Sequence, residues 1–175
     1  MQIRIAVLAN KDLSKLSKKV AKDLSKLSKS FFWVDGKKFA HHITLFDIFA
    51  NGKDISQADN LAKGLISKKS GLLLPVNNLW RNSSGYVGFK IKHTKELLAF
   101  RKKLFKNLAK FKSENVGKIY NAHITLTRYK DFSFADKAQL KNKIKKVFKF
   151  NTIIFGKADK HGQIYQILKK FKLKV

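Results

Sequence analysis

The sequence predicts an α+β protein built from two similar lobes, because two of its features recur along the chain. The tetrapeptide His-Ile-Thr-Leu occurs twice, beginning at His42 and again at His123, 81 positions later. Segments of strand and helix character surround both copies, and their order repeats at about the same interval, which indicates an internal duplication. We expect one domain over residues 1–175, with lobes at roughly 1–92 and 93–175.

Length and composition limit the class of protein. The 175 residues are 44% apolar and include 15 Phe, which is enough to bury a core. The chain has no Cys, which excludes disulfides and thiolate chemistry and is typical of a reducing cytosol. No segment approaches a membrane span, and the N-terminus is too short for a signal sequence. We expect a soluble cytoplasmic monomer without membrane association.

The net charge of +28, from 39 Lys and Arg against 11 Asp and Glu, is the strongest bulk feature. Such a field attracts polyanions, so it favours nucleic acid as a partner. Only four of the basic residues are Arg, and Lys is spread through every segment, as AT-rich coding would also produce. The charge supports an RNA substrate, but it does not separate a binding surface from codon bias.

In the first half of the chain, periodicity defines the elements. The predicted elements are a strand at 2–9, a helix at 11–30, a short strand or loop at 31–34, a strand at 39–48, a helix at 54–68 and a strand at 72–80. Asn10 can cap the first helix, whose Leu and Val residues recur at intervals of three and four with lysines opposite. Asn51 and Gly52 separate the tetrapeptide strand from the second helix.

The second half repeats this order. After a strand at 86–91 that closes the first half, the predicted elements are a helix from the cap Thr94 to about 111, a strand at 119–126, a helix at 135–147 and strands at 148–155 and 163–171. The polar run from Asn82 to Gly85 predicts a hairpin connection. The helix at 135–147 has a weak apolar stripe through Ala138, Ile144 and Val147.

Each tetrapeptide has one apolar face and one chemical face, because side chains two residues apart on a strand point the same way. His42 and Thr44 therefore share a face, as do His123 and Thr125. The intervening Ile and Leu residues face the other side, where a core can cover them.

Two His-x-Thr strands predict acid/base chemistry on a phosphodiester. Imidazole can take and give a proton near neutral pH. One imidazole can deprotonate an attacking water or hydroxyl while the other protonates the departing oxygen, and the hydroxyls can hold the phosphate oxygens. One His-x-Thr alone is most often a structural histidine, whereas two copies in corresponding strands favour a site.

This chemistry needs neither metal nor cofactor. The five histidines show no metal-ligand spacing, and the glycines form no P-loop or dinucleotide-binding loop. We therefore expect no metal, no cofactor and no nucleotide-hydrolysing motor.

The chain resembles the 2H phosphoesterase superfamily, especially its 2′-5′ RNA ligase and RNA 2′,3′-cyclic phosphodiesterase group. The resemblance rests on His42-Ile43-Thr44-Leu45, on His123-Ile124-Thr125-Leu126-Thr127-Arg128, on their spacing and on the element order. It implies a bilobal fold with two antiparallel sheets lining a central cleft and two helices outside each lobe. It also implies metal-independent opening of a 2′,3′-cyclic phosphate to a 2′-phosphate.

The resemblance further implies a division of roles that the nearly symmetric sequence cannot choose by itself. His123 with Thr125 would position and activate water, and His42 with Thr44 would protonate the leaving 3′ oxygen. Arg128 matches a basic residue that often follows the second motif and would bind phosphate. In a regular strand it lies on the opposite face from Thr125, so that role requires a bulge or bend.

Asp47 and two aromatic residues complete the candidate list. Asp47 occupies the position equivalent to Arg128 and would repel a phosphate unless paired, so we expect a structural role, with a lysine as partner. Trp80 and Tyr86 flank the polar hairpin tip and are the best candidates for stacking on unpaired bases.

Three functions fit these observations. The first is an enzyme that opens terminal 2′,3′-cyclic phosphates of RNA. The second keeps the chemistry but joins or cleaves 2′-5′ linkages in RNA, or acts on small nucleotide cyclic phosphates. The third is a binding module that holds RNA ends or nucleotides without turnover. The physiological RNA and the reaction direction are not encoded in any motif.

Overall fold

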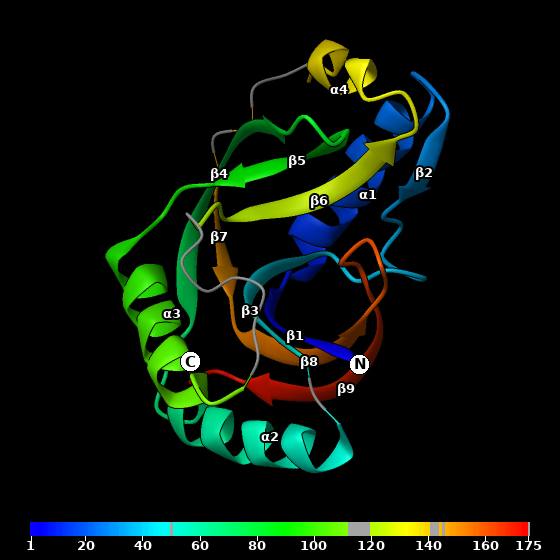
Figure 1. Cartoon of the computed structure of the whole chain (residues 1–175). Helices are drawn as coiled ribbons and strands as arrows, with labels where there is room; N and C mark the ends of the chain where they lie inside the picture. The colour runs from blue at the N-terminus through cyan, green and yellow to red at the C-terminus, as the bar shows by residue number, and fades with distance from the viewer. Residues whose placement is uncertain (50, 112–119, 141–143, 145, 175) are drawn as a thin grey trace.

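The computed structural model describes residues 1–49, 51–111, 120–140, 144 and 146–174. In this part of the chain, nine strands form two antiparallel sheets (Figure 1). The first sheet has the order β3 (His42–Phe49), β1 (Gln2–Leu8), β8 (Thr152–Ala158) and β9 (Ile164–Lys172). The second has the order β2 (Ser30–Trp33), β6 (His123–Tyr129), β5 (Tyr86–Ile91), β4 (Leu72–Arg81) and β7 (Lys146–Phe150).

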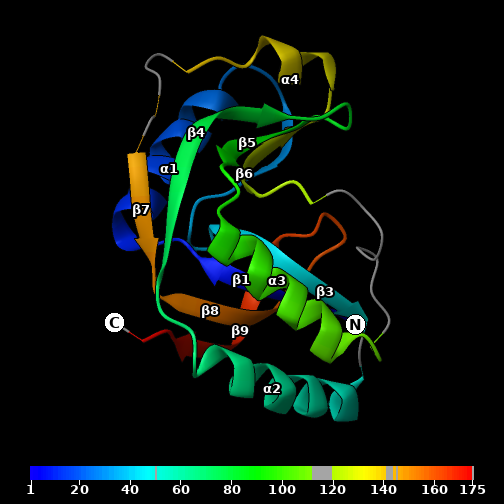
Figure 2. The ribbon, with the colours of Figure 1, turned by 90° about the vertical axis from the view of Figure 1, so that its left-hand side faces the viewer.

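Two helices pack on each sheet. Helices α2 (Gly52–Ile66) and α3 (Lys95–Leu108) contact each other and lie against the first sheet through β9 and β3 (Figure 2). Helices α1 (Lys11–Ser25) and α4 (Ser133–Lys137) contact β6 of the second sheet. The predicted α+β fold of two antiparallel sheets with two outer helices each is confirmed.

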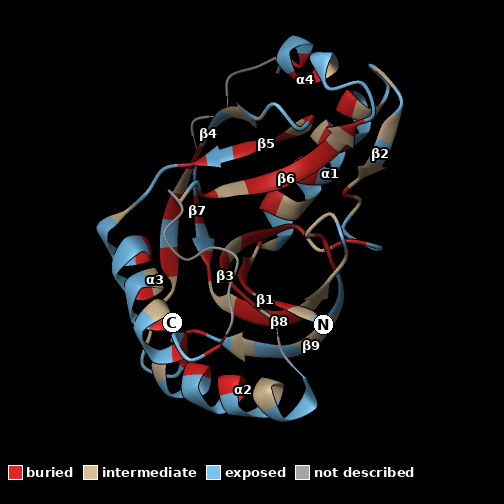
Figure 3. Ribbon diagram, viewed as in Figure 1, coloured by how far each residue is buried: buried red, intermediate tan, exposed pale blue. Residues whose placement is uncertain are grey.

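Each sheet combines strands from both halves of the chain. Strands β8 and β9 come from the second half but extend the sheet of β1 and β3, and β4 and β5 come from the first half but pair with β7 and β6 of the second half. One continuous hydrophobic core runs through both sheets. Buried residues are concentrated along β1, β3 and β6 (Figure 3), so the two tetrapeptide strands are held by the core itself.

Local signals in the sequence explain where the longer helices begin. The Asn10 side chain accepts a hydrogen bond from the backbone of Leu13 at 2.9 Å, and Thr94 does the same for Leu97 at 3.2 Å. Asn51 forms a reciprocal capping box with Asp54 at the start of α2. None of the helices in the described residues has the length and apolar character needed to span a membrane.

The predicted helix at 135–147 is wrong beyond Lys137. Helix α4 ends at Lys137, and Val147 lies in strand β7, which pairs with β4. Phe148 and Phe150 are buried while Val147 is exposed, so the two-residue alternation of a strand prevails there over a weak helical stripe. Residues 141–143 and 145 of the predicted helix lie outside the described residues.

Both tetrapeptide strands carry a β-bulge at the leucine of the motif. Between β1 and β3, Ala6 pairs with Thr44 but Ile5 pairs with Phe46, so Leu45 is the extra residue. Between β5 and β6, the pairing skips Leu126 in the same way. An extra residue shifts the alternation of every side chain that follows it.

The bulges bring the positions after each motif onto the chemical face. Asp47, three residues after Thr44, lines the same cavity as Thr44. Arg128, three residues after Thr125, contacts Tyr86 and His161 at the edge of this cavity. The bend that a cleft-facing Arg128 required is therefore present.

Gly88 allows the second bulge to form. It pairs with Thr125, and a Cβ atom at position 88 would overlap the backbone carbonyl of Ile124. The backbones of β5 and β6 therefore approach more closely than any side chain permits, and Gly is required for steric reasons.

We predict that Gly88→Ala lowers the free energy of unfolding by about 1–3 kcal/mol or more, because the backbone of β6 must move away. Gly64→Ala is the matched control. Its Cβ would meet nothing within 4 Å on helix α2, and it should raise stability by about 0.5–1 kcal/mol. Urea unfolding of the three proteins measures both effects. Wild-type stability of the Gly88 variant would contradict the steric argument.

Candidate active site

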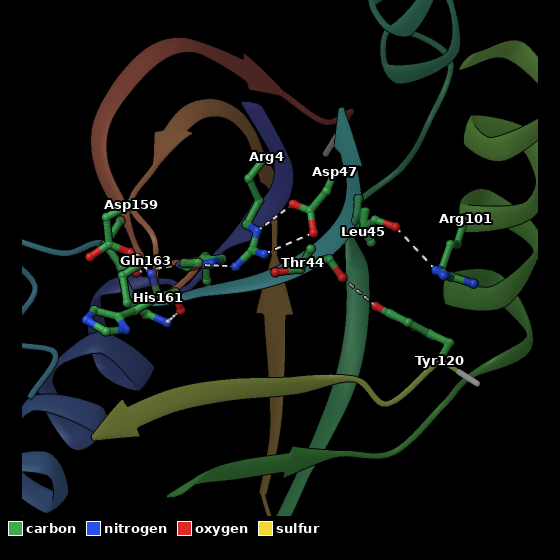
Figure 4. A network of polar contacts seen from close by, with 12 residues as sticks. Arg4, Thr44, Leu45, Asp47, Arg101, Tyr120, Asp159, His161 and Gln163 are labelled. Carbon is green, nitrogen blue, oxygen red and sulfur yellow. Dashed lines mark hydrogen bonds and ion pairs between the residues drawn. The ribbon is translucent and has the colours of Figure 1, made fainter. Parts of the chain in front are cut away.

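A cavity of about 440 Å³ opens between the two sheets. Its walls come from β1 and β3 on one side, β4, β5 and β6 on the other, helix α3 and the β8–β9 turn. Figure 4 shows the polar network along the first of these walls. The lining residues are Arg4, Thr44, Leu45, Asp47, Trp80, Asn82, Tyr86, Arg101, Tyr120, Asn121, His123, Thr125, His161 and Gln163.

Three of the four predicted motif residues line this cavity, and the fourth is enclosed. His123, Thr44 and Thr125 are on its wall. His42 is only 5% exposed and is not part of the wall. The charge of His123 contributes to the lowered pKa of His42, so the two imidazoles are close enough to interact electrostatically.

The two motif histidines are held in the same way. Nδ1 of His42 lies 2.7 Å from the carbonyl oxygen of Ala40, and Nδ1 of His123 lies 2.7 Å from that of Asn121, in each case two residues upstream. A carbonyl oxygen only accepts hydrogen bonds, so Nδ1 carries the hydrogen in both rings. The neutral rings therefore keep a free lone pair on Nε2, as a general base requires.

Burial and nearby cations keep both imidazoles neutral. Burial, and after it the charge of Arg4, lowers the pKa of His42 to about 3. Burial lowers the pKa of His123 to about 4, although its bond to Asn121 acts in the opposite direction. At neutral pH the free protein therefore holds two neutral rings, and an acid role requires that a bound anion restore a proton.

Arg4 is a cavity residue that the sequence analysis did not identify. Its Nε and Nη2 donate to the two carboxylate oxygens of Asp47 at 2.6 and 2.9 Å, and its Nη1 donates to the carbonyl of Gly162. The partner of Asp47 among the described residues is therefore an arginine, where the sequence analysis expected a lysine. Arg4 and Asp47 are direct partners in the β1–β3 register, so the pair becomes visible once that strand pairing is assumed.

The β8–β9 turn adds a polar edge to the cavity. Asp159 accepts hydrogen bonds from the backbone of His161 at 2.9 Å and of Gln163 at 2.8 Å, and Gly162 takes a positive φ of 72°. Gln163 is buried, and its Oε1 has no hydrogen-bond partner among the described residues. This turn therefore leaves one buried acceptor unpaired among the described residues.

Arg128 stands at the edge of the cavity rather than on its wall. Its Nε donates to the carbonyl of Ser84 at 3.1 Å, and its Nη1 donates to Nδ1 of His161 at 2.9 Å. Its guanidinium also lies over the rings of Phe31 and Tyr86. These contacts hold His161 and Tyr86 in place, so Arg128 organises one end of the cavity.

The two predicted base-stacking residues line the cavity but already contact protein groups. Trp80 stacks on His123 with ring centroids 3.8 Å apart and an interplanar angle of 14°. The hydroxyl of Tyr86 donates to the carbonyl of His161 at 3.3 Å, and burial raises the pKa of Tyr86. Trp80 therefore fixes the plane of the second motif imidazole.

In the part of the chain that the structure describes, no group of three or more His, Cys, Asp or Glu is arranged to hold a metal ion. The cavity brings together the imidazole of His123, two threonine hydroxyls and two arginines, and the enclosed imidazole of His42 lies two residues before Thr44 on the same strand. This set suits an anionic ligand with acid/base chemistry at its centre.

No protein-family model matches the chain, and no curated protein matches its sequence. Solved structures do match its fold. The protein TT0787 of Thermus thermophilus is 14% identical with a TM-score of 0.76, covering 99% of this chain and 98% of that one. LigT of E. coli, complexed with 3′-AMP, is 14% identical with a TM-score of 0.74 and the same coverage.

A third similar structure is the MHV ns2 PDE domain, which is 10% identical with a TM-score of 0.58 and covers 99% of this chain and 100% of that one. LigT of E. coli is also known in complexes with phosphate, NADP+ and ATP. At these identities the likeness establishes the fold over nearly the whole chain. The fold is consistent with the resemblance to the 2H phosphoesterase superfamily.

We predict that Arg4→Gln raises the pKa of His42 and that of His123, because the charge of Arg4 lowers the pKa of both imidazoles. NMR titration of the imidazole signals measures both values without any substrate. The double variant Arg4→Gln with Asp47→Asn is the control. It removes the pair without leaving a lone carboxylate, so its shift should have the same sign and be smaller. An unchanged His42 titration in both variants would contradict the role given to Arg4.

Proposed function

We propose that residues 1–175 form one 2H phosphoesterase domain that opens 2′,3′-cyclic phosphates at RNA ends to 2′-phosphates without a metal. The observation that carries the proposal is that the Nδ1 atoms of His42 and His123 are each held by the backbone carbonyl two residues upstream. Each histidine is followed two residues later by a threonine that lines the same cavity. In both rings Nδ1 is bound to a backbone carbonyl, so Nε2 is the nitrogen left to take or give a proton.

In the proposed reaction, water attacks the phosphorus of the cyclic ester as one imidazole Nε2 takes its proton. The bond from phosphorus to the 3′ oxygen breaks, and the other imidazole gives that oxygen a proton. The product is a 2′-phosphomonoester with a free 3′ hydroxyl. Thr44 and Thr125 hold the non-bridging oxygens, which keeps the attacking water in line with the leaving oxygen.

The electrostatics of the site support an anionic substrate. In the free protein both imidazoles are neutral, with pKa values of about 3 and 4. A bound phosphate brings negative charge next to both rings and raises their pKa values, so the acid becomes protonated when substrate is present. Substrate binding thus supplies the negative charge that allows one of the two imidazoles to be protonated and act as the acid.

RNA or nucleotides are the proposed partners. The net charge of +28 favours a polyanion. LigT of E. coli, which shares the fold, is known in complexes with 3′-AMP and with phosphate. These ligands support a nucleotide phosphate as the group bound in the cavity.

Two observations bear on the division of roles and point in opposite directions. His123 lies on the cavity wall, where water enters, while His42 is enclosed, which favours His123 with Thr125 as the water-activating pair. His123 also has the higher pKa, which by itself favours it as the acid. We propose that access of water decides, so that His42 protonates the 3′ oxygen.

We predict that His42→Ala and His123→Ala each lower kcat on a nucleoside 2′,3′-cyclic phosphate by about 10²–10⁴-fold, since each removes one proton-transfer group. Turnover is followed by chromatography of the 2′-phosphate product. EDTA should leave the wild-type rate unchanged. Near-wild-type activity of either variant would refute the two-histidine reaction. Tight binding of the cyclic phosphate by the wild-type protein without product would identify a binding module instead.

A leaving group that needs no proton separates acid from base. We predict that His42→Ala, but not His123→Ala, recovers most of its lost activity on bis(4-nitrophenyl) phosphate, because nitrophenolate departs without protonation. The absorbance of nitrophenolate measures the rate. Recovery in His123→Ala alone would reverse the two roles.

A further inference from the structure

The wall of the cavity formed by α3 carries an arginine that neither the motifs nor the proposed reaction uses. Arg101 reaches from α3 to β3, where its Nε donates to the carbonyl oxygen of Leu45 at 3.2 Å (Figure 4). Leu45 is the bulged residue of the first motif. The contact therefore places the guanidinium of Arg101 against strand β3, beside the residue three positions after His42.

Two aromatic rings fix the plane of this guanidinium. Its Cζ lies 4.1 Å from the centre of the Tyr120 ring and 4.3 Å from that of Phe105. Tyr120 is itself fixed, because its hydroxyl donates to the carbonyl of Thr44 at 2.9 Å. A guanidinium held between rings keeps its orientation, so little entropy is lost when its edge binds a ligand.

The Nη1–Nη2 edge of the Arg101 guanidinium has no hydrogen-bond partner among the described residues. Arginine has five N–H donors, and Nε is the only nitrogen of Arg101 with a hydrogen-bond partner among the described residues. No described carboxylate forms an ion pair with it. Burial lowers the pKa of Arg101, which shows that its charge is partly desolvated. An anion on the Nη1–Nη2 edge would compensate that desolvation.

The residue type also indicates a function. Only four of the 39 basic residues are arginines, yet the cavity lining includes Arg4 and Arg101 and no described lysine. Arg4 is committed to Asp47 and Gly162. Arg101 alone offers the planar fork that binds a phosphate through two parallel hydrogen bonds.

We propose that Arg101 binds a second phosphate of the substrate, the 5′-phosphate of the nucleotide whose 3′ end reacts. The proposal rests on the proposed function and adds a substrate preference to it. Leu45 is three residues beyond His42, a span of about 10 Å along a regular strand, so the subsite lies further along β3 than the first motif histidine. The site would then favour RNA ends and 5′-phosphorylated nucleotides over nucleosides that carry only the cyclic phosphate.

The test compares two ligands that differ by this phosphate alone, adenosine 3′-phosphate and adenosine 3′,5′-bisphosphate. Calorimetric titration gives a dissociation constant for each. The wild-type protein should bind the bisphosphate about tenfold more tightly, or better, as a charge-assisted bond to phosphate predicts. Arg101→Gln should bring the ratio of the two constants close to one. Arg101→Lys should give an intermediate ratio, because it keeps the charge but loses the fork.

Lys102→Gln is the matched control. Lys102 is the next residue on α3, is exposed, and does not line the cavity. It removes the same charge from the same helix and should keep the wild-type ratio. An equal drop in Lys102→Gln and Arg101→Gln would show a general charge effect and overturn the proposal.

Two further results would also overturn it. One is a wild-type ratio near one. The other is an Arg101→Gln variant that weakens both ligands equally, since Arg101 would then only hold α3 against β3. Amide NMR spectra check that the variants are folded, and Arg101→Lys provides the comparison if Arg101→Gln is not. Because binding is measured without turnover, an Arg101-dependent ratio in a protein that opens no cyclic phosphate would refute the proposed reaction and leave the phosphate subsite standing.

Discussion

The β-bulge in each motif strand, between β5 and β6 and between β1 and β3, is the constraint on which the site depends. At each place a small residue, Gly88 or Ala6, faces a threonine of the motif, and one extra residue follows in the partner strand. This bulge keeps histidine and threonine on the cavity face and then shifts the alternation. Residues after the motif that would have faced the core now face the cavity or its edge. The same irregularity in both sheets gives the site its approximate symmetry.

The symmetry of the backbone is not repeated in the charges. After the first motif the bulge presents Asp47, which binds Arg4 on the neighbouring strand. After the second it presents Arg128, which lies over Tyr86 on the neighbouring strand. One end of the cavity therefore holds a neutralised ion pair beside the histidines, and the other holds a cation among aromatic rings. This asymmetry is a physical basis for two identical tetrapeptides to take different roles.

Polar groups of the cavity are held largely by backbone carbonyls. Ala40 and Asn121 orient the imidazoles, Gly162 holds Arg4, and Leu45 holds Arg101. A carbonyl accepts hydrogen bonds without adding a charge, so it can orient a cation or an imidazole and leave the positive field intact. The cavity thus retains an attraction for anions.

The sequence by itself determined most strands and helices, the internal duplication and the pairing of each His with a Thr on one strand face, because these follow from local periodicity. The arrangement in two antiparallel sheets was implied by the resemblance carried by the repeated motif. Tertiary structure alone decided the rest. The strand that replaces the end of the predicted fourth helix exists because β4 offers it a partner. Arg4, Arg101 and Gln163 join the site from three distant elements, and no spacing along the chain connects them. Bulges likewise depend on which residue faces them across a sheet, and that information exists only once the strands are paired.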